Sequence, residues 1–432
     1  MPISISRSPS SMRRWAKRAA VSVALWAVLG CPGRAPRPAP ATGEPELRIA
    51  IAVGGANASI GGPESGELFV SDATTGVPVG SVAPGVRWVI VADSADPSRL
   101  RLMRPDSTPT APLRGIAVVN VTENRFVVAN GRRYRGRITV TAGRGGLTVV
   151  NRVGVESYIA GVVGPEIGPR RPDETDAVLA QAVVSRSFAV KNRGRWDAFG
   201  FDAYADTRDQ VYLGVAVETN QVWDAVRRTA GQVLEYDGGV IDAYFHSTCG
   251  FSTASVEEAF ATTRTRPYLR PVSDDRGGGH YYCDISPRFR WREEWDGPKL
   301  RTILSRTLAT VMPVSGDGLP RITDVTVSRT TRSGRVGELR IVFERGDIRI
   351  PGPDVRSVLR PDPDRTLSSA AFQLAVTKDA GGVVDRVVAV GAGSGHAVGM
   401  CQWGAIGRAR AGQDYRKILS TYFPGTKIEK IY

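Results

Sequence analysis

The stretch GPEIGPRRPDETDAVLAQAVVSRSFAVKNR, residues 164–193, decides how the middle of the chain folds. Its first part is rich in proline and glycine, which leaves little room for a helix, so we expect Glu166 to lie on a constrained loop. A helix should then begin near Asp173, a favoured N-cap residue, with acidic residues in its first turn and basic residues near its end. Arg186 falls beside the apolar face of this helix, whereas Gln181 lies off it.

On both sides of this helix the sequence predicts strands. Short apolar runs rich in β-branched residues are separated by Gly, Asn and Pro, a pattern typical of a β-rich unit. The runs are LRIAIAV, RWVIVA, IAVVNV, RFVVA, RITVT and LTVVNRVGV, starting at residues 47, 87, 116, 125, 137 and 147. Farther on, ITDVTVS and ELRIVFE are separated by RTTRSGRVG and predict a hairpin. We therefore predict an α+β fold: a β-rich N-terminal part, a central region with a long helix, and an inserted α/β subdomain.

Composition excludes several classes of protein. The chain has 432 residues, of which 42% are hydrophobic and 23% charged, so it is neither disordered nor collagenous. Its formal charge of +14 is partly due to the basic leader. We find no helix-turn-helix, zinc finger or basic stripe interleaved with aromatic residues, and we therefore predict no nucleic-acid partner.

Residues 1–31 resemble a bacterial lipoprotein signal peptide. Basic residues precede a short apolar stretch that ends in Val-Leu-Gly-Cys31, and the small residue before Cys31 favours its acylation over a plain signal peptide with an incidental cysteine. Residues 32–46 are rich in Pro and Ala and predict a linker. The protein should therefore work in the cell envelope, outside the cytoplasm, held to a membrane by lipid and facing the periplasm if the cell is Gram-negative.

Two H-x-x-C pairs, His246 with Cys249 and His280 with Cys283, offer the donors that zinc prefers. Together they would close a tetrahedral site with no open position, so such a metal would be structural. A Cys249–Cys283 disulfide is the competing interpretation for an oxidising compartment, and unpaired core residues are a third.

The glycine-rich segment GSGHAVGMCQWGA, residues 393–405, allows close approach of the backbone to a ligand. His396, Gln402 and Trp403 supply hydrogen bonds and a flat apolar face suited to sugar rings. Cys401 with His396 as nucleophile and base is a weaker alternative, because no orienting acid is evident.

Several of these motifs occur together in the order of one known family. From about Arg114 to Tyr432, the chain resembles the stage II sporulation protein D (SpoIID/LytB) family. The resemblance rests on GPEIG, the DAVLAQAVVSRSFAV helix, DTRDQVY, AYFHSTCGFSTAS, CDISPRFRW, GHAVGMCQWGA and YFPGT.

This resemblance implies a lytic transglycosylase that acts on peptidoglycan glycan strands stripped of their peptides, or alternatively a non-catalytic wall-binding enhancer of a cell-wall amidase. It places Glu166 at the position of the catalytic glutamate and implies zinc near His246 and Cys249. Residues expected in the substrate cleft are Arg186, Gln210, Tyr212, His396 and Gln402. The departures from the family pattern are Pro165, Phe251 and Ala397.

A lytic transglycosylase needs one carboxyl group, because the C6 hydroxyl of the muramyl sugar attacks C1 and Glu166 serves as acid and then base. Glu166 should therefore have a raised pKa in an apolar setting. Asp206 and Asp209 are the candidate second carboxylates of a hydrolase, which uses a pair. We expect residues 47–146 to form the β-rich part, 147–294 the catalytic core, 295–385 the inserted subdomain, and 386–432 the C-terminal motif that completes the core.

Overall fold

The computed structural model describes residues 43–122, 125–143, 145–262, 264–308 and 319–432. The predicted signal peptide, the lipidation site Cys31 and most of the predicted linker lie outside these residues. Within the described ranges, no helix has both the length and the apolar character that crossing a membrane requires.

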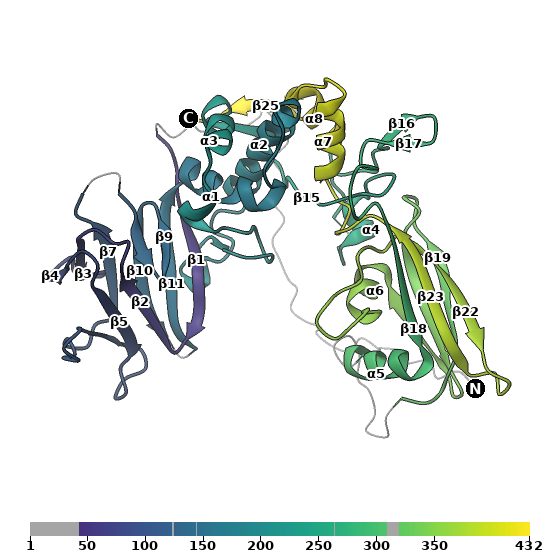
Figure 1. The fold of residues 1–432 in the computed structure, drawn as a ribbon, viewed down its shortest axis with the longest axis horizontal. Coiled ribbons are helices and arrows are strands. Elements are labelled where there is room, and N and C mark those ends of the chain that lie inside the picture. The colour runs from purple at the N-terminus through teal and green to yellow at the C-terminus, as the bar shows by residue number, and fades with distance from the viewer. Residues whose placement is uncertain (1–42, 123–124, 144, 263, 309–318) are drawn as a thin grey trace, which may run out of the picture. The chain divides into compact units, whose positions relative to one another are not determined.

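The N-terminal part consists of two sheets that share one hydrophobic core with the central helices. One sheet has the order β12-β1-β11-β10-β7-β3-β4, made of Ala203–Tyr204, Glu46–Gly55, Gly146–Gly154, Arg137–Gly143, Gly115–Asn120, Leu68–Asp72 and Pro78–Val82. The other has the order β6-β5-β2-β8-β9, made of Leu100–Met103, Arg87–Ala92, Asn57–Gly61, Val127–Ala129 and Arg132–Tyr134. The predicted β-rich N-terminal part is confirmed, and each of the six predicted runs contains a strand (Figure 1).

Helix α1 (Val155–Ile167) corrects one prediction, because Glu166 lies in its last turn and not on a loop. Pro165 is inside the helix and cannot donate to the Gly161 carbonyl one turn earlier. That carbonyl instead accepts the N–H of Leu213 at 3.2 Å. The proline is therefore tolerated because a neighbouring segment takes over the lost hydrogen bond.

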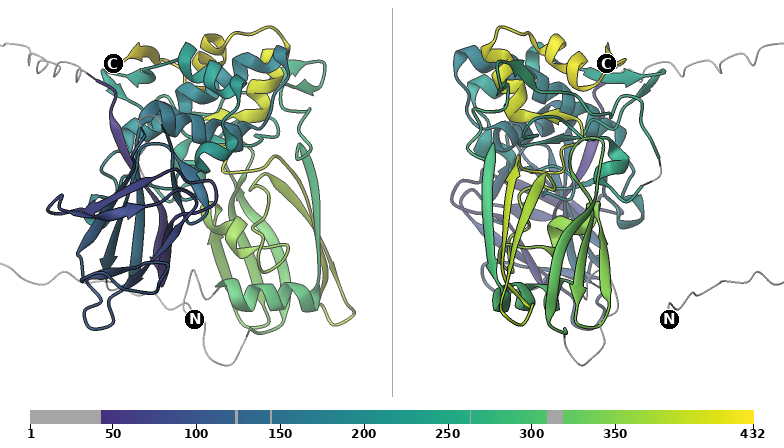
Figure 2. Two further views of the ribbon diagram at one scale, coloured as in Figure 1. Left: turned by 60° about the vertical axis from the view of Figure 1, so that its left-hand side comes forward. Right: turned by 90° about the vertical axis from the view of Figure 1, so that its right-hand side faces the viewer.

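Helix α2 (Thr175–Lys191) confirms the predicted long helix and follows a 3₁₀ turn, η1 (Pro172–Glu174). It is buried on every side from Ala177 to Ala189, so Gln181 is buried as well. The elements that pack on it are α1, α3 (Asn220–Arg228), β13 (Gln232–Tyr236), α7 (Gln402–Arg410) and α8 (Tyr415–Tyr422). Both views in Figure 2 show the C-terminal helices beside α2, although they are distant in sequence.

Short elements connect the larger helices and strands. Strand β15 (Phe245–His246) pairs in parallel with β24 (Met400–Cys401), which brings the C-terminal motif beside the central region. The others are η2 (Asp197–Phe199), η3 (Gly214–Val217), β14 (Gly239–Val240), α4 (Val256–Ala259), β16 (Asp275–Gly277), β17 (His280–Tyr281) and β25 (Lys427–Lys430).

A second hydrophobic core is formed by buried side chains from the segment that runs from Trp295 to Ala389. Two three-stranded sheets and two helices surround it, and the predicted hairpin is present as β19 paired antiparallel with β20. The elements are β18 (Arg290–Asp296), α5 (Gly297–Thr307), β19 (Ile322–Thr330), β20 (Val336–Phe343), β21 (Asp347–Pro351), α6 (Gly352–Val358), β22 (Phe372–Lys378) and β23 (Val384–Ala392). The α+β class is therefore confirmed in both halves of the chain.

Arg186 on α2 forms a buried ion pair that we expect to be essential for stability. Its side chain is fully buried and donates to Glu156 at 3.0 and 2.6 Å through Nε and Nη2. Arg186→Met should lower the free energy of unfolding by about 3–5 kcal/mol, because it leaves the Glu156 charge poorly compensated. Urea denaturation measures this loss.

The matched control is Arg228→Met, since Arg228 pairs with Asp224 on the exposed surface of α3. That variant should lose at most about 1 kcal/mol. Equal losses in the two variants would contradict the structural role assigned to Arg186.

Candidate active site

Glu166 lines a pocket of about 470 Å³ whose walls combine aromatic side chains with charged ones. The other lining residues are Phe188, Arg195, Thr207, Arg208, Asp209, Val211, Tyr244, Phe245, Phe260 and His396. The acid from α1 and the histidine from the C-terminal glycine-rich segment therefore open into one cavity. A groove of about 700 Å³, lined by Arg266, Arg270, Arg329 and Arg332 among others, shares no residue with it.

The carboxyl group of Glu166 is held from one side. Its Oε1 accepts the N–H of Val211 at 2.9 Å, and its backbone carbonyl accepts Nε2 of Gln402 at 2.9 Å. Burial raises the pKa of Glu166 above the ordinary carboxyl value, and the contacts with Val211 and Gln402 oppose this shift without cancelling it. The side chain therefore favours the protonated form more than an exposed glutamate does.

Gln402 connects the C-terminal motif to the acid. Besides the Glu166 carbonyl, its Nε2 donates to Oε1 of Gln181 on α2 at 3.2 Å. Both contacts use the side-chain amide, and Gln402 is buried. Gln402 therefore holds the backbone of Glu166 in place, and it is not among the residues that line the pocket.

His396 lies among aromatic rings on the pocket wall. Its ring centroid is 5.2 Å from that of Phe260 and 5.6 Å from that of His246. Burial, and next the charge of Arg356, lower the pKa of His396 to about 4, so the ring is neutral at physiological pH. Ala397, the departure from the family glycine, has a φ of +67°, which is the left-handed conformation that an alanine rarely adopts.

The two candidate second carboxylates are both engaged. Asp209 lines the pocket, but its oxygens accept hydrogen bonds from Arg195, Trp196 and the Tyr204 backbone. Asp206 is half exposed, and the hydrogen bonds from Arg208 lower its pKa. Among these three acids Glu166 is the one whose pKa is raised.

Four other residues expected in the cleft do not line the Glu166 pocket. Arg186 faces Glu156 inside the core. Gln210 and Tyr212 are buried. The side-chain oxygen Oε1 of Gln210 accepts a hydrogen bond from the Tyr158 hydroxyl, and the Tyr212 hydroxyl donates to Oδ1 of Asn151. Trp403 is half buried, and its ring lies under Arg170. These residues support the walls of the site, and His396 is the one predicted sugar-binding residue that lines the cavity.

Only two of the four predicted zinc ligands come together. Cys249 and Cys283 lie in a buried group with Asp274 and Cys401 whose donor atoms are all within 4.8 Å of one another, and this group can hold a metal ion. His280 is exposed and contacts Asp284 instead. His246 is buried, with its Nδ1 beside the Val398 carbonyl, so the set of two H-x-x-C pairs is not assembled.

Two other cysteine hypotheses, the Cys249–Cys283 disulfide and the Cys401 nucleophile, find no support in this geometry, whereas buried unpaired cysteines agree with it. Cys249 and Cys283 are free thiols with their sulfur atoms 3.5 Å apart, not a disulfide. Burial raises the pKa of Cys401 well above its ordinary value, which does not suit a nucleophile. Its sulfur belongs to the donor group and not to the Glu166 pocket.

Sequence reasoning missed Asp274 and several pocket residues. Asp274 occurs in VSDDRG, where no motif distinguishes it from its acidic neighbour. Cys401 could have been assigned to the cluster from the odd number of cysteines beyond the leader, because three cysteines cannot all pair with one another. The aromatic residues Phe188, Tyr244 and Phe260 have no sequence pattern that predicts a pocket.

Comparisons with known proteins match the segment that carries Glu166. A family model described as SpoIID, stage II sporulation protein, matches residues 143–236, which include Glu166 and α2. A model for a domain of unknown function matches residues 278–399.

Curated relatives match more of the chain. An uncharacterized protein of Brachyspira hyodysenteriae is 31% identical over 72% of this chain and 76% of its own length. Stage II sporulation protein D of Bacillus subtilis is 27% identical over 65% of this chain and 76% of its own length. The amidase enhancer of Bacillus subtilis is 25% identical over 59% of this chain but only 38% of its own length. The chain belongs to the SpoIID family, a family linked to sporulation and peptidoglycan remodelling, and is distantly homologous to stage II sporulation protein D and the amidase enhancer.

The raised pKa of Glu166 has a measurable effect on stability. The native protein retains this proton at pH values where the unfolded chain has lost it, so stability falls as pH rises from the ordinary carboxyl pKa through the raised one. Glu166→Gln removes this titration and keeps an acceptor for the Val211 N–H. The variant should therefore become progressively more stable than the wild type as pH rises over that range, as measured by urea denaturation at acidic and neutral pH.

Asp206→Asn is the control with the opposite sign. The pKa of Asp206 is lowered, so its contribution is present above the ordinary pKa and lost as pH falls through the lowered one. Asp206→Asn should therefore slightly lower the free energy of unfolding at neutral pH and leave it unchanged in acid. A Glu166→Gln difference that did not change with pH would contradict the raised pKa.

Proposed function

We propose that the chain is a peptidoglycan lytic transglycosylase that cleaves peptide-free glycan strands, with Glu166 as its single general acid and base. The observation that carries this proposal is a buried carboxyl group with a raised pKa that lines the same pocket as several aromatic rings and His396 of the glycine-rich motif. A protein that only binds wall has no chemical need for such a group.

In the proposed reaction Glu166 donates its proton to the bridging glycosidic oxygen as the bond from that oxygen to C1 of the muramyl sugar breaks. The C6 hydroxyl of the same sugar then bonds to C1, and the Glu166 carboxylate accepts the hydroxyl proton. The products are a 1,6-anhydro-muramyl end and a free hydroxyl on the leaving sugar, and no water is consumed. The Val211 N–H and the backbone hydrogen bond from Gln402 hold the acid in place for both transfers.

Phe260, Tyr244 and the neutral His396 ring suit the apolar faces of a sugar. Arg195 and Arg208 line the same cavity, each already paired with an aspartate, Asp209 and Asp206 respectively, and their remaining N–H donors suit the carboxylates that muramyl residues carry once their peptides are removed. These contacts would favour denuded strands over peptide-bearing ones.

A metal in the buried donor group would have no part in this reaction, because none of the four donors lines the Glu166 pocket. We therefore assign it a structural role. Acylation of Cys31 and a proline-rich tether would keep the enzyme at the membrane surface, in reach of the wall and of an amidase that prepares its substrate.

Glu166→Gln should lower the release of anhydro-muramyl products from peptide-free glycan strands at least about 100-fold, because the proton donor is lost. Binding to denuded sacculi should be unchanged. Mass spectrometry of the soluble products and a co-sedimentation assay measure the two effects.

Glu257→Gln on the exposed surface of α4 is the matched control and should cleave as the wild type does. The opposite outcome has two parts. Neither the wild type nor the control releases products, and all three proteins, Glu166→Gln included, bind wall and stimulate an amidase equally. In that case the protein is an amidase enhancer and the proposed reaction is wrong.

A further inference from the structure

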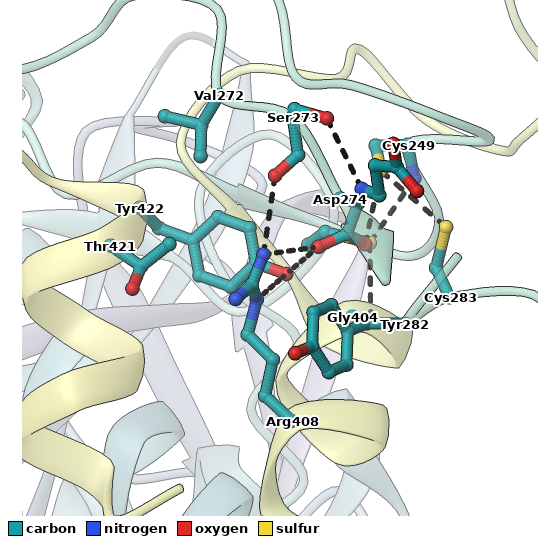
Figure 3. A network of polar contacts seen from close by, with 12 residues as sticks. Cys249, Val272, Ser273, Asp274, Tyr282, Cys283, Gly404, Arg408, Thr421 and Tyr422 are labelled. Carbon is teal, nitrogen blue, oxygen red and sulfur yellow. Dashed lines mark hydrogen bonds and ion pairs between the residues drawn. The ribbon is translucent and has the colours of Figure 1, made fainter. Parts of the chain in front are cut away.

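The buried group of Cys249, Asp274, Cys283 and Cys401 combines residues from three separate parts of the chain. Figure 3 shows Cys249, Asp274 and Cys283 of this group with their polar contacts. Sulfur of Cys249 lies 3.5 Å from that of Cys283 and 3.4 Å from Oδ2 of Asp274. In a tetrahedral zinc site, metal–sulfur bonds of about 2.3 Å place ligand atoms roughly 3.5–3.8 Å apart. The donor group therefore has about the dimensions of an assembled site.

Backbone amides point at the sulfur atoms. Sulfur of Cys401 accepts the N–H of Cys249 and the N–H of Gly404, each at 3.2 Å. A neutral thiol is a weak acceptor, whereas a metal-bound thiolate is stabilised by N–H donors of this kind. Gly404 is also required here for space, because a Cβ at this position would lie 2.1 Å from the Tyr422 hydroxyl and 2.3 Å from Oδ2 of Asp274.

Asp274 is oriented as a ligand with its own supporting contacts. Its Oδ1 accepts the Tyr422 hydroxyl at 2.6 Å and Nη2 of Arg408 at 3.1 Å. Its Oδ2 faces the sulfur atoms. One carboxylate oxygen held by protein donors and the other directed at the thiols is the arrangement found around bound metals, where partners of the ligands fix their orientation.

Two guanidinium groups balance the charge of such a site. Three thiolates and a carboxylate around a divalent cation leave two excess negative charges. Arg408 contacts Asp274 directly, and the buried Arg335 donates to the Cys249 carbonyl at 3.0 Å. In the described part of the chain the hydrogen bonds of the Arg335 guanidinium all go to carbonyl oxygens, so the thiolates would supply this buried cation with compensating charge.

We propose that Cys249, Cys283, Cys401 and Asp274 bind one thiophilic divalent cation, for which zinc is the best match, in a closed structural site. Binding displaces the protons of the thiols to solvent and forms three metal–sulfur bonds and one metal–oxygen bond. The ion ties Cys401, the residue before Gln402, to the central region. This inference does not depend on glycan cleavage, because it concerns metal content and folding.

The test is elemental analysis of the full-length protein purified under reducing conditions. We expect about one zinc per chain, and substitution with cobalt should give the intense sulfur-to-metal charge-transfer absorption of a tetrahedral thiolate site. Cys283→Ser and Asp274→Asn should each lower metal retention at least about tenfold.

His280→Ala is the matched control, because His280 belongs to an H-x-x-C pair but is exposed and outside the donor group. It should retain the metal fully, and its loss of metal would overturn the proposal. Three reactive thiols without metal would also overturn it, as would a Cys249–Cys283 disulfide detected by the loss of two hydrogens in the mass spectrum. If the ligand variants do not fold, the cobalt spectrum of the wild type decides.

Discussion

A helix buried on all sides must find a partner for every polar group it carries, and α2 meets this requirement with residues from α1 and from the C-terminal segment. Arg186 pairs with Glu156 on α1, and the C-terminal Tyr432 hydroxyl donates to the same carboxylate. The side-chain oxygen of Gln181 accepts a hydrogen bond from the side-chain amide of Gln402 on α7. Asp176 accepts a hydrogen bond from the backbone N–H of Tyr415, the first residue of α8. Each of these contacts takes a polar group out of water only because a distant segment supplies its complement. The packing of α1, α7 and α8 around this helix is what places the acid and the glycine-rich motif in one pocket.

The setting of Glu166 follows from a local irregularity that the rest of the core stabilises. Pro165 releases the Gly161 carbonyl, and Leu213 takes it. Two residues before Leu213, the N–H of Val211 reaches the Glu166 carboxylate. The proline that interrupts the helical hydrogen bonds thus anchors the segment that holds the acid, while burial by aromatic residues raises its pKa. Next to His396, Ala397 is held in a conformation that favours glycine, so the surrounding structure outweighs a local backbone preference at this position.

Much of the fold follows from periodicity. The alternating strands and the long helix have clear local patterns, so their existence and class could be predicted. Glu166 was assigned to a loop because proline counts against a helix, and the compensating donor on Leu213 is a long-range contact that no local pattern contains. The donor group shows the same limit. Local H-x-x-C spacing favoured His246 and His280, whereas the structure joins Cys401 and Asp274 to Cys249 and Cys283 across the fold. Residues were best predicted where one segment determines their place, and least well where several segments must meet.

The position of the last residues has a consequence for biosynthesis. Gln402, Tyr415 and Tyr432 all complete the surroundings of α2, and β25 at the C-terminus pairs with β13. A chain still emerging from the ribosome lacks these residues and cannot close the core around the acid. Assembly of the pocket therefore waits until the segment from Gln402 to Tyr432 has been synthesised and has packed against α2.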